Sequence, residues 1–111
     1  MTTRSKQLYS EDSVPTSNTD IYTVPSGRTT ILKGVAWNNG GGTSSYLFVW
    51  LKRAADSALC VLWARNSLPN GTIGQEQMWA VLEEGDKLQV LAGHSGITLV
   101  LSGTELQGVA P

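Results

Sequence analysis

The stretch from Asp20 to Asn38 reads Asp-Ile-Tyr-Thr-Val-Pro-Ser-Gly-Arg-Thr-Thr-Ile-Leu-Lys-Gly-Val-Ala-Trp-Asn, and its order of residue types indicates the fold class. β-Branched and aromatic residues are enriched on both sides of a turn signal, as is typical of strands on a pleated, half-buried surface. In that turn, Pro25 presets φ, and Gly27 accepts a positive φ. The stretch therefore predicts two successive strands joined by a tight turn.

The same pattern continues along the rest of the chain. Apolar runs with a period of two recur about every ten residues, separated by clusters of Gly, Pro, Asn and Ser. Residues 75–82 also have helix propensity, but their context favours a strand. The pattern predicts an all-β, antiparallel β-sandwich of jelly-roll type, with about seven strands, or about eight if part of residues 7–14 pairs at an edge. The expected strands are residues 20–24, 29–38, 46–53, 58–65, 75–82, 87–93 and 97–104.

The length of 111 residues suits one compact domain. We expect the sandwich to occupy residues 19–106, between an N-terminal arm of residues 1–18 and a C-terminal tail of residues 107–111. The arm has too few apolar residues to offset the ordering cost of about 1–2 kcal/mol per residue for its backbone. A neighbouring subunit is therefore expected to order it, with Leu8 and Tyr9 joining an exposed sheet edge.

Composition excludes several classes of function. Charged residues make up 15% of the chain, well below the usual quarter, and the formal net charge is −1. Such a chain has no basic field to attract a phosphate backbone, so we expect no nucleic-acid partner. The polar start lacks the apolar segment of a signal peptide, and no later stretch is long enough to span a bilayer. We therefore expect a protein made in a cytoplasm, not secreted and without a membrane partner.

Residues able to do chemistry are few. The single histidine, His94, lies next to Ser95 in an expected turn, which is poor geometry for a relay between base and nucleophile. One histidine and one cysteine do not make a closed set of transition-metal ligands. Cys60 lies in the apolar run 59–63, where a buried, inert thiol is expected. The sequence therefore predicts no enzyme, no metal site and no cofactor.

Three further patterns each have a chemical and a structural interpretation. Glu83, Glu84 and Asp86 could together hold a hard cation such as calcium, although a polar turn is the commoner explanation. The glycine run 40–42 lacks the Lys-Ser/Thr of a phosphate loop and reads as a flexible connection. Residues 70–72 match the N-glycosylation pattern, but without a secretory signal they indicate only a turn.

Aromatic residues are the best candidates for contact with a partner. Each of the four tryptophans falls in a different expected strand, so some belong to the core and others to a contact surface. The candidate subunit-interface residues are Leu8, Tyr9, Tyr46, Trp50 and Trp79. Exposed rings on a sandwich also stack on sugars, so Tyr46, Trp50 or Trp79 could instead form a carbohydrate platform. Coplanar rings on one open face would favour that alternative.

Two groups of motifs carry a resemblance to a known family. The first is the Tyr-Thr-Val-Pro-Ser-Gly turn at residues 22–27, with a strand that ends at Asn38-Asn39-Gly40. The second is Leu-Glu-Glu-Gly-Asp at residues 82–86, expected to be a hairpin, with a final strand that closes on Ser102-Gly103. This order resembles that of the small β-sandwich virion proteins of tailed bacteriophages, which are minor tail, tail-tip or capsid-decorating subunits.

The resemblance covers residues 19–105, and it implies a function in the virion. A protein of this kind binds neighbouring tail or capsid subunits, forms homo-oligomers in the particle and brings no active-site motif. This chain departs from the family pattern in its tryptophan content and in the turn at residues 54–57. The resulting hypothesis is a minor tail or head decoration protein. The alternative is a carbohydrate-binding β-sandwich module for attachment to a host surface.

Overall fold

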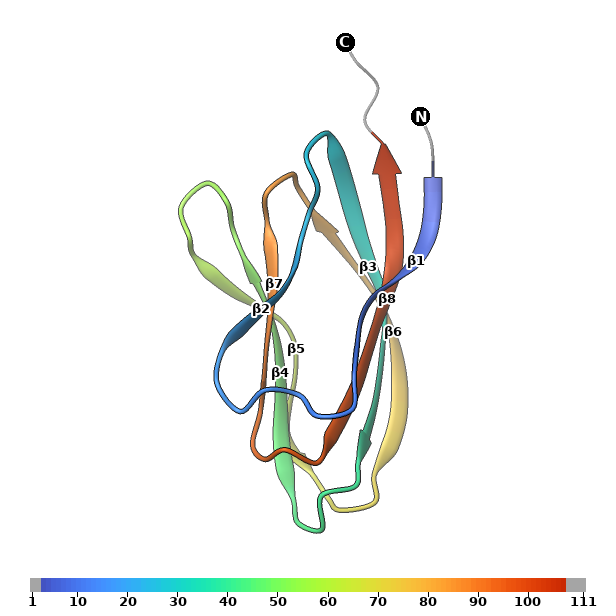
Figure 1. The fold of residues 1–111 in the computed structure, drawn as a ribbon, viewed down its shortest axis with the longest axis vertical. Helices are drawn as coiled ribbons and strands as arrows, with labels where there is room; N and C mark the ends of the chain where they lie inside the picture. Colours follow the sequence, from blue (N-terminus) through green and yellow to red (C-terminus); the bar gives the residue numbers. More distant parts are fainter. Residues whose placement is uncertain (1–2, 108–111) are drawn as a thin grey trace.

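The computed structural model describes residues 3–107, which form eight β-strands and no helix (Figure 1). The strands are β1 (Thr3–Glu11), β2 (Thr19–Thr23), β3 (Arg28–Asn39), β4 (Ser45–Lys52), β5 (Leu59–Leu68), β6 (Ile73–Leu82), β7 (Lys87–Ala92) and β8 (Ile97–Gln107). They make two antiparallel four-stranded sheets that face each other. The first sheet has the order β1-β8-β3-β6, and the second has the order β2-β7-β4-β5. This arrangement confirms the predicted jelly-roll sandwich.

Most connections cross from one sheet to the other. Only β4 and β5 are sequential neighbours within a sheet. The Leu-Glu-Glu-Gly-Asp turn was expected to close a hairpin, but it joins β6 of the first sheet to β7 of the second. Gly85 has a φ of 82° in this turn, which explains the glycine there. Local turn chemistry was therefore predicted correctly, whereas the pairing of the flanking strands was not.

The core lies between the two sheets and is made by alternate residues of each strand. In β8, Ile97, Leu99 and Leu101 are fully buried, while the residues between them face outward, as the period-two pattern predicts. Burial of each such side chain stabilises the fold by about 1.5–3 kcal/mol. No described part of the chain is a helix long and apolar enough to cross a membrane.

The N-terminal segment belongs to the sandwich, which corrects the prediction of an arm over residues 1–18. Strand β1 pairs with β8 of its own chain, so that Tyr9 lies opposite Leu101. Leu8 and Val14 are buried in the core. The few apolar residues of the segment fall at inward positions, and the ladder to β8 satisfies its backbone. Of the predicted arm and tail, residues 1–2 and 108–111 lie outside the described residues, and Gln107 ends β8.

Candidate interaction surfaces

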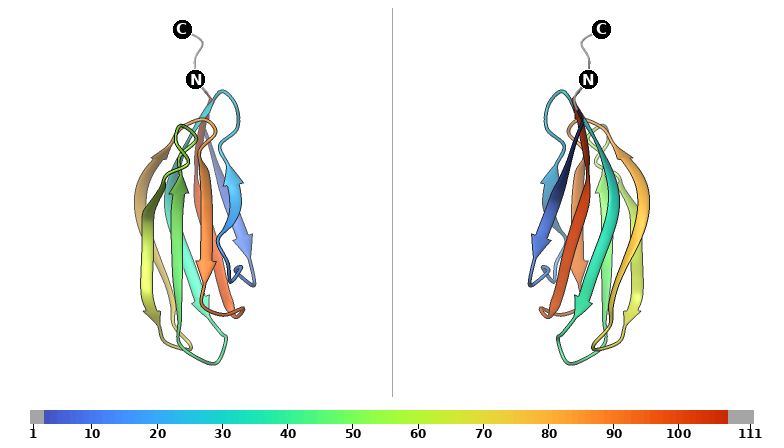
Figure 2. Two further views of the ribbon diagram at one scale, coloured as in Figure 1. Left: turned by 90° about the vertical axis from the view of Figure 1, so that its left-hand side faces the viewer. Right: turned by 90° about the vertical axis from the view of Figure 1, so that its right-hand side faces the viewer.

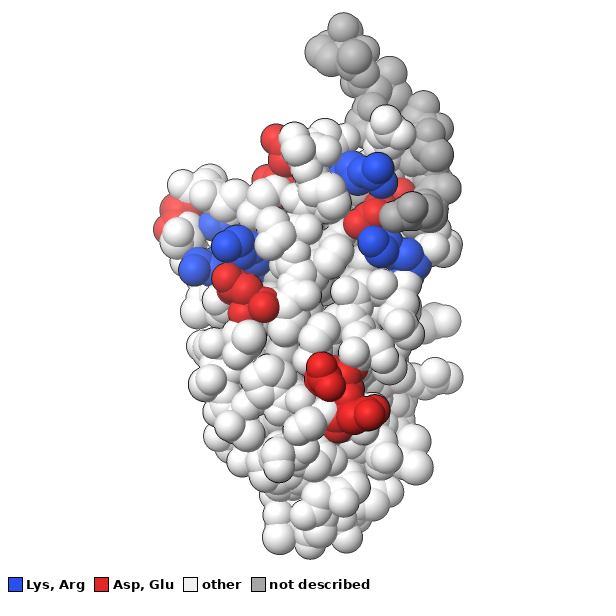
Figure 3. Space-filling view, viewed as in Figure 1, with Lys and Arg blue, Asp and Glu red and all other residues white. Residues whose placement is uncertain are grey.

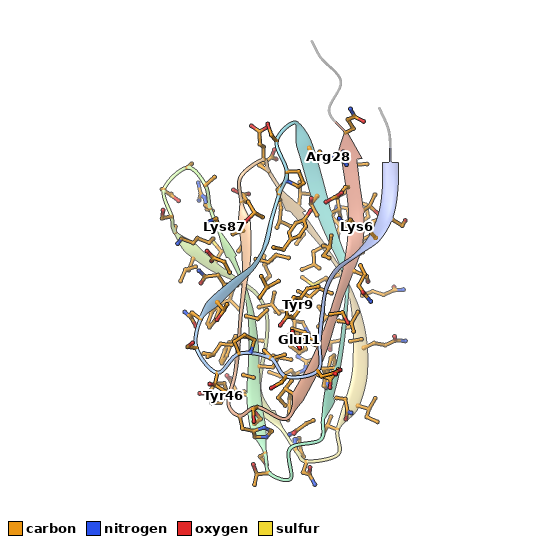
Figure 4. The ribbon with its side chains drawn as sticks, viewed as in Figure 1. Lys6, Tyr9, Glu11, Arg28, Tyr46 and Lys87 are labelled. Atoms are coloured by element: carbon orange, nitrogen blue, oxygen red, sulfur yellow. The ribbon has the colours of Figure 1, made fainter. Side chains whose placement is uncertain are left out.

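The five predicted interface residues lie in three different places. Leu8 belongs to the core and Tyr9 packs against it (Figure 4), so neither is available to a neighbouring subunit in the way expected. Burial, and then the charge of Glu11, raises the pKa of Tyr9. Tyr46 and Trp50 share the outward face of β4 in the second sheet. Trp79 lies on the outward face of β6 in the first sheet, so the structure does not bring it together with the other two.

Three aromatic rings follow the outward face of β4. The ring centroids of Tyr46 and Phe48 are 5.7 Å apart, and those of Phe48 and Trp50 are 5.3 Å apart with an angle of 7° between the planes. Phe48 was not among the predicted residues, although its spacing of two from Tyr46 and Trp50 was the signal that could have found it. Because Phe48 and Trp50 stack on each other, they do not form the coplanar platform that favours sugar binding.

The outer face of the first sheet is hollowed because its side chains are small. Two shallow hollows of about 530 and 430 Å³ lie along β3. Both are lined by Ala36, Gln75 and Val100, so they form one continuous groove. Gly34 and Ser102 complete one part of it, and Ile73, Gly74 and Thr98 border the other. The groove is open and mostly uncharged, which suits packing against another surface better than enclosing a small substrate.

Strand β6 forms one edge of the first sheet, and β1 forms the other (Figure 2, right). Three of its apolar side chains are well exposed: Ile73 is 77%, Trp79 67% and Val81 48% exposed. The ammonium group of Lys33 lies 5.1 Å from the centroid of the Trp79 ring. The only charged residue of β6 is Glu76, and its carboxylate accepts hydrogen bonds from Arg65 and from the indole of Trp63, both on β5. The outward face of β6 is therefore uncharged, and its three large apolar side chains alternate with the amides of Gln75 and Gln77.

Trp37 and Trp63 belong to the core, in contrast to the exposed Trp79. Both are buried, and their rings lie 5.0 Å apart between the sheets, beside the edge that β5 and β6 form. The guanidinium group of Arg65 lies 5.3 Å from the Trp63 ring and 5.8 Å from the Trp37 ring. Arg65 thus pairs with Glu76 and covers two indoles, which closes this side of the core.

Cys60 is exposed, and this corrects the prediction of a buried thiol. It lies on β5 between Leu59 and Val61, which are exposed as well. The β4–β5 hairpin leans away from the opposite sheet (Figure 1), so neither face of its outer part is covered. An apolar run at an uncovered position looks the same in sequence as a run in the core.

The residues considered for catalysis or cation binding hold loops together. Gly96 N–H donates to Nδ1 of His94, which leaves the proton on Nε2 to bond the carbonyl oxygen of Thr43 at 3.1 Å. Asp86 accepts hydrogen bonds from the backbone N–H groups of Ala54 and Glu83, each at 2.9 Å. Among residues 3–107, no group of three His, Cys, Asp or Glu side chains is placed to hold a metal ion.

The charged side chains gather away from the loops that join β3 to β4, β5 to β6 and β7 to β8. Figure 3 shows this for the face that carries β1 and β2: the Lys, Arg, Asp and Glu residues lie in its upper and middle parts, and the lower end is uncharged. The loop residues at that end, 40–44, 69–72 and 93–96, include no Lys, Arg, Asp or Glu. An uncharged end and an uncharged sheet edge are surfaces that cost little to desolvate.

A buried polar cluster lies at the opposite end, between the sheets. The Glu105 carboxylate is 1% exposed and accepts a hydrogen bond from the Tyr22 hydroxyl at 2.6 Å. Lys6 and Arg28 reach it from the two neighbouring strands at 3.5 and 3.4 Å (Figure 4). Burial, and then the hydrogen bond to Glu105, raises the pKa of Tyr22 to about 12. The cluster therefore favours the neutral phenol.

This raised pKa predicts a pH dependence of stability. The stabilisation from a neutral Tyr22 is fully present below its ordinary value of 10.0 and is lost as the pH rises towards about 12. We therefore expect the native protein to melt at a higher temperature than Tyr22→Phe near neutral pH, and this difference to shrink between pH 10 and 12. Thermal denaturation at several pH values measures it, with Tyr46→Phe on the outer face as the matched control. If the difference in melting temperature between the native protein and Tyr22→Phe does not change with pH, the role of Tyr22 is contradicted.

These features define an eight-stranded jelly-roll sandwich with apolar packing surfaces, in which the polar groups serve mainly to hold loops and close the core. No protein-family model and no curated protein matches the sequence. Among solved structures, the chain is similar to one from Bacillus endospore appendages, described as a novel family of disulfide-linked pili. The TM-score is 0.59 and the identity 7%, over 97% of this chain and 90% of that one.

A second similar chain comes from the structure of infectious bursal disease virus, Gx strain. The TM-score is 0.52 and the identity 11%, over 94% of this chain and 30% of the viral one, so the sandwich spans about a third of that chain's length. At such identities the likeness shows the fold alone. It is a fold found in proteins of a virus and of pili.

Proposed function

We propose that this chain is a structural protein of a tailed-bacteriophage virion, a minor tail or head decoration subunit that works by packing against neighbouring tail or capsid subunits. The observation that carries this proposal is the apolar edge strand β6, where Ile73, Trp79 and Val81 are all well exposed. Trp79 and Val81 are neighbours on the outward face of β6, and exposed apolar side chains that adjoin each other mark contact surfaces in soluble proteins. The adjoining groove on the outer face of the first sheet extends the same surface.

Two further findings support the proposal. The fold occurs in proteins of pili and of a virus, so it is compatible with building large assemblies. The turn motifs at residues 22–27 and 82–86 resemble those of small phage virion proteins. We propose no catalytic role, because His94 and Asp86, the best candidates for chemistry, are engaged in loop contacts. We likewise propose no nucleic-acid or membrane partner, and we expect the protein to be found in the virion.

Purified particles test this proposal. We expect the chain to remain with particles through a density gradient and to be identified in them by mass spectrometry at a fixed stoichiometry. Cryo-electron microscopy of the same particles would then show density that fits the sandwich, on the tail or on the capsid faces. A chain that is expressed with the particles but is washed away from them would contradict a structural role.

The alternative proposal is a carbohydrate-binding module, and the observation that favours it is the exposure of the Trp79 indole. One face of that ring lies near Lys33, which leaves less of it for a sugar than an open platform would offer. A glycan array with the native protein and Trp79→Ala separates the proposals. A glycan that binds the native chain and is lost in the variant would support the carbohydrate function.

A further inference from the structure

Strand β6 differs from the other sheet edges in being poorly protected against pairing. Of the other three edges, β2 has only five residues, β1 carries Lys6, and β5 carries Arg65 and has two register shifts against β4. β6 has ten residues without proline, lysine or arginine, and a single register shift against β3, between Gln77 and Ala80. Short strands, irregularities and positive charges are the means by which proteins keep edges from pairing.

The side chains of β6 also keep a regular alternation that suits a further strand. Residues 73, 75, 77, 79 and 81 are all exposed, and the residues between them are partly buried. Within residues 3–107, β6 has β3 as its single strand neighbour. Another extended strand can pair with such a free row of N–H and C=O groups in place of water. The edge is therefore suited to β-strand addition.

We infer that β6 pairs antiparallel with β6 of a second copy of this chain, around a two-fold axis at Gln77, so that the first sheets of two copies join into one continuous sheet. The inference rests on the proposed function, packing between subunits, and names the surface and the partner. A two-fold axis requires the contact strand to complement itself. With the axis at Gln77, β6 complements itself in this way. Ile73 lies opposite Val81 of the second copy, and Gln75 lies opposite Trp79.

Neighbouring registers fit less well. Outward side chains must lie opposite outward side chains, so the axis must pass through a residue and not between two. An axis at Glu76 places that carboxylate opposite its own copy, and like charges opposite each other are destabilising. An axis at Met78 leaves Ile73, the most exposed of the large apolar residues, without a partner. The axis at Gln77 pairs residues 73–81 of both copies over about 30 Å.

The groove supports the same arrangement. Gln75 lines both hollows on the outer face of the first sheet, and Ala36 lies beside it on β3. In the proposed register, Trp79 of the second copy lies next to Gln75, on the same outer face as the groove. The small side chains there leave room for an indole, and the two-fold axis repeats this contact in the other copy.

The oligomeric state of the purified chain tests this inference. We expect light scattering coupled to gel filtration to give a mass near 24 kDa, twice the 11.9 kDa of one chain. Gln77→Lys places two lysines opposite each other at the axis and should give a monomer at a concentration at which the native chain is dimeric. The matched control is Gln7→Lys, which makes the same exposed change on β1, at the other edge of the sheet, and should leave the dimer intact. Circular dichroism spectra like that of the native chain, with a cooperative thermal transition, confirm that both variants are folded.

Cross-linking tests the register independently of charge. In a Cys60→Ser background, Gln77→Cys should form a covalent dimer when oxidised glutathione is added, because the two introduced thiols meet at the axis. Gln75→Cys should not, because it lies opposite Trp79 of the second copy. A native chain that is monomeric at high concentration, a dimer that Gln77→Lys does not split, or cross-linking through residue 75 but not 77 would each overturn the inference.

The outcomes separate this inference from the proposed function. If the native chain is monomeric in solution but remains with the particles, the β6 pairing is wrong and the structural role stands. If the native chain forms the predicted dimer but is absent from particles, the interface stands and the virion function is wrong.

Discussion

Replacing Asn39 by aspartate should lower the free energy of unfolding by about 3–5 kcal/mol, although the two side chains have nearly the same shape. Asn39 is fully buried, and its Nδ2 donates to the carbonyl oxygens of Thr43 and Leu68 at 3.0 and 2.7 Å. In the variant, a carboxylate oxygen would face these two carbonyl oxygens. Both hydrogen bonds would be replaced by repulsion in a site closed to water.

The large effect is expected because Asn39 connects the β3–β4 loop to the β5–β6 loop at the uncharged end of the sandwich. Its Oδ1 accepts from the N–H of Gly41, and its backbone exchanges hydrogen bonds with Gly71 and Thr72. Urea denaturation followed by circular dichroism measures the loss. The matched control is Asn38→Asp, one residue earlier and exposed, which should change stability by less than about 0.5 kcal/mol. Equal effects of the two variants would show that the buried amide is not the connecting group.

Replacing Gly103 by alanine should cost about 2–4 kcal/mol, against the usual expectation that alanine is better than glycine in a strand. Gly103 lies in β8 between β1 and β3, and a Cβ there would overlap the backbone carbonyl oxygen of Ile31 and come within 3.1 Å of Leu8. A backbone atom in the middle of a sheet cannot move aside without breaking the ladder. The two central strands would have to separate locally.

Gly34→Ala is the control for this prediction. Gly34 lies opposite Ser102 on β8, and its added Cβ would approach the Ser102 hydroxyl oxygen at 2.7 Å. A hydroxyl on a single rotatable bond can turn away, so the cost should stay below about 1 kcal/mol. Thermal and urea denaturation of both variants give the comparison. A Gly103→Ala protein as stable as Gly34→Ala would mean that the sheet tolerates the displacement.

The period-two pattern was sufficient to predict the class of fold and seven of the strands, but not which tryptophans are buried. In β3, Lys33 is exposed and Trp37 is buried, although strict alternation would put both on one face. The register shift between Leu32 and Gly34 reverses the faces from that point on. A bulge of this kind depends on the neighbouring strands, which the sequence of β3 does not include.

The environments of single residues were predicted only in part. Tyr46, Trp50 and Trp79 are on outer faces, because each occupies an outward position in its strand, and their role in an interface stays a prediction. Leu8 and Cys60 were assigned the wrong environments. The burial of Leu8 follows from pairing with β8, more than ninety residues away, and the exposure of Cys60 follows from a hairpin that leaves the sandwich. Neither relation is present in the local sequence.

The position of β8 in the first sheet governs how the chain can fold. The last of the eight described strands lies between β1 and β3, so β1 has no neighbour in the sheet until residues 97–107 have been synthesised. Pairing of the first and last strands closes a loop of nearly the whole chain, and such non-local contacts slow folding to the range of milliseconds to seconds. Until then the apolar faces of the earlier strands are open to solvent and to other nascent chains. The sandwich is therefore completed by the insertion of β8 between β1 and β3, after the other described strands have been made.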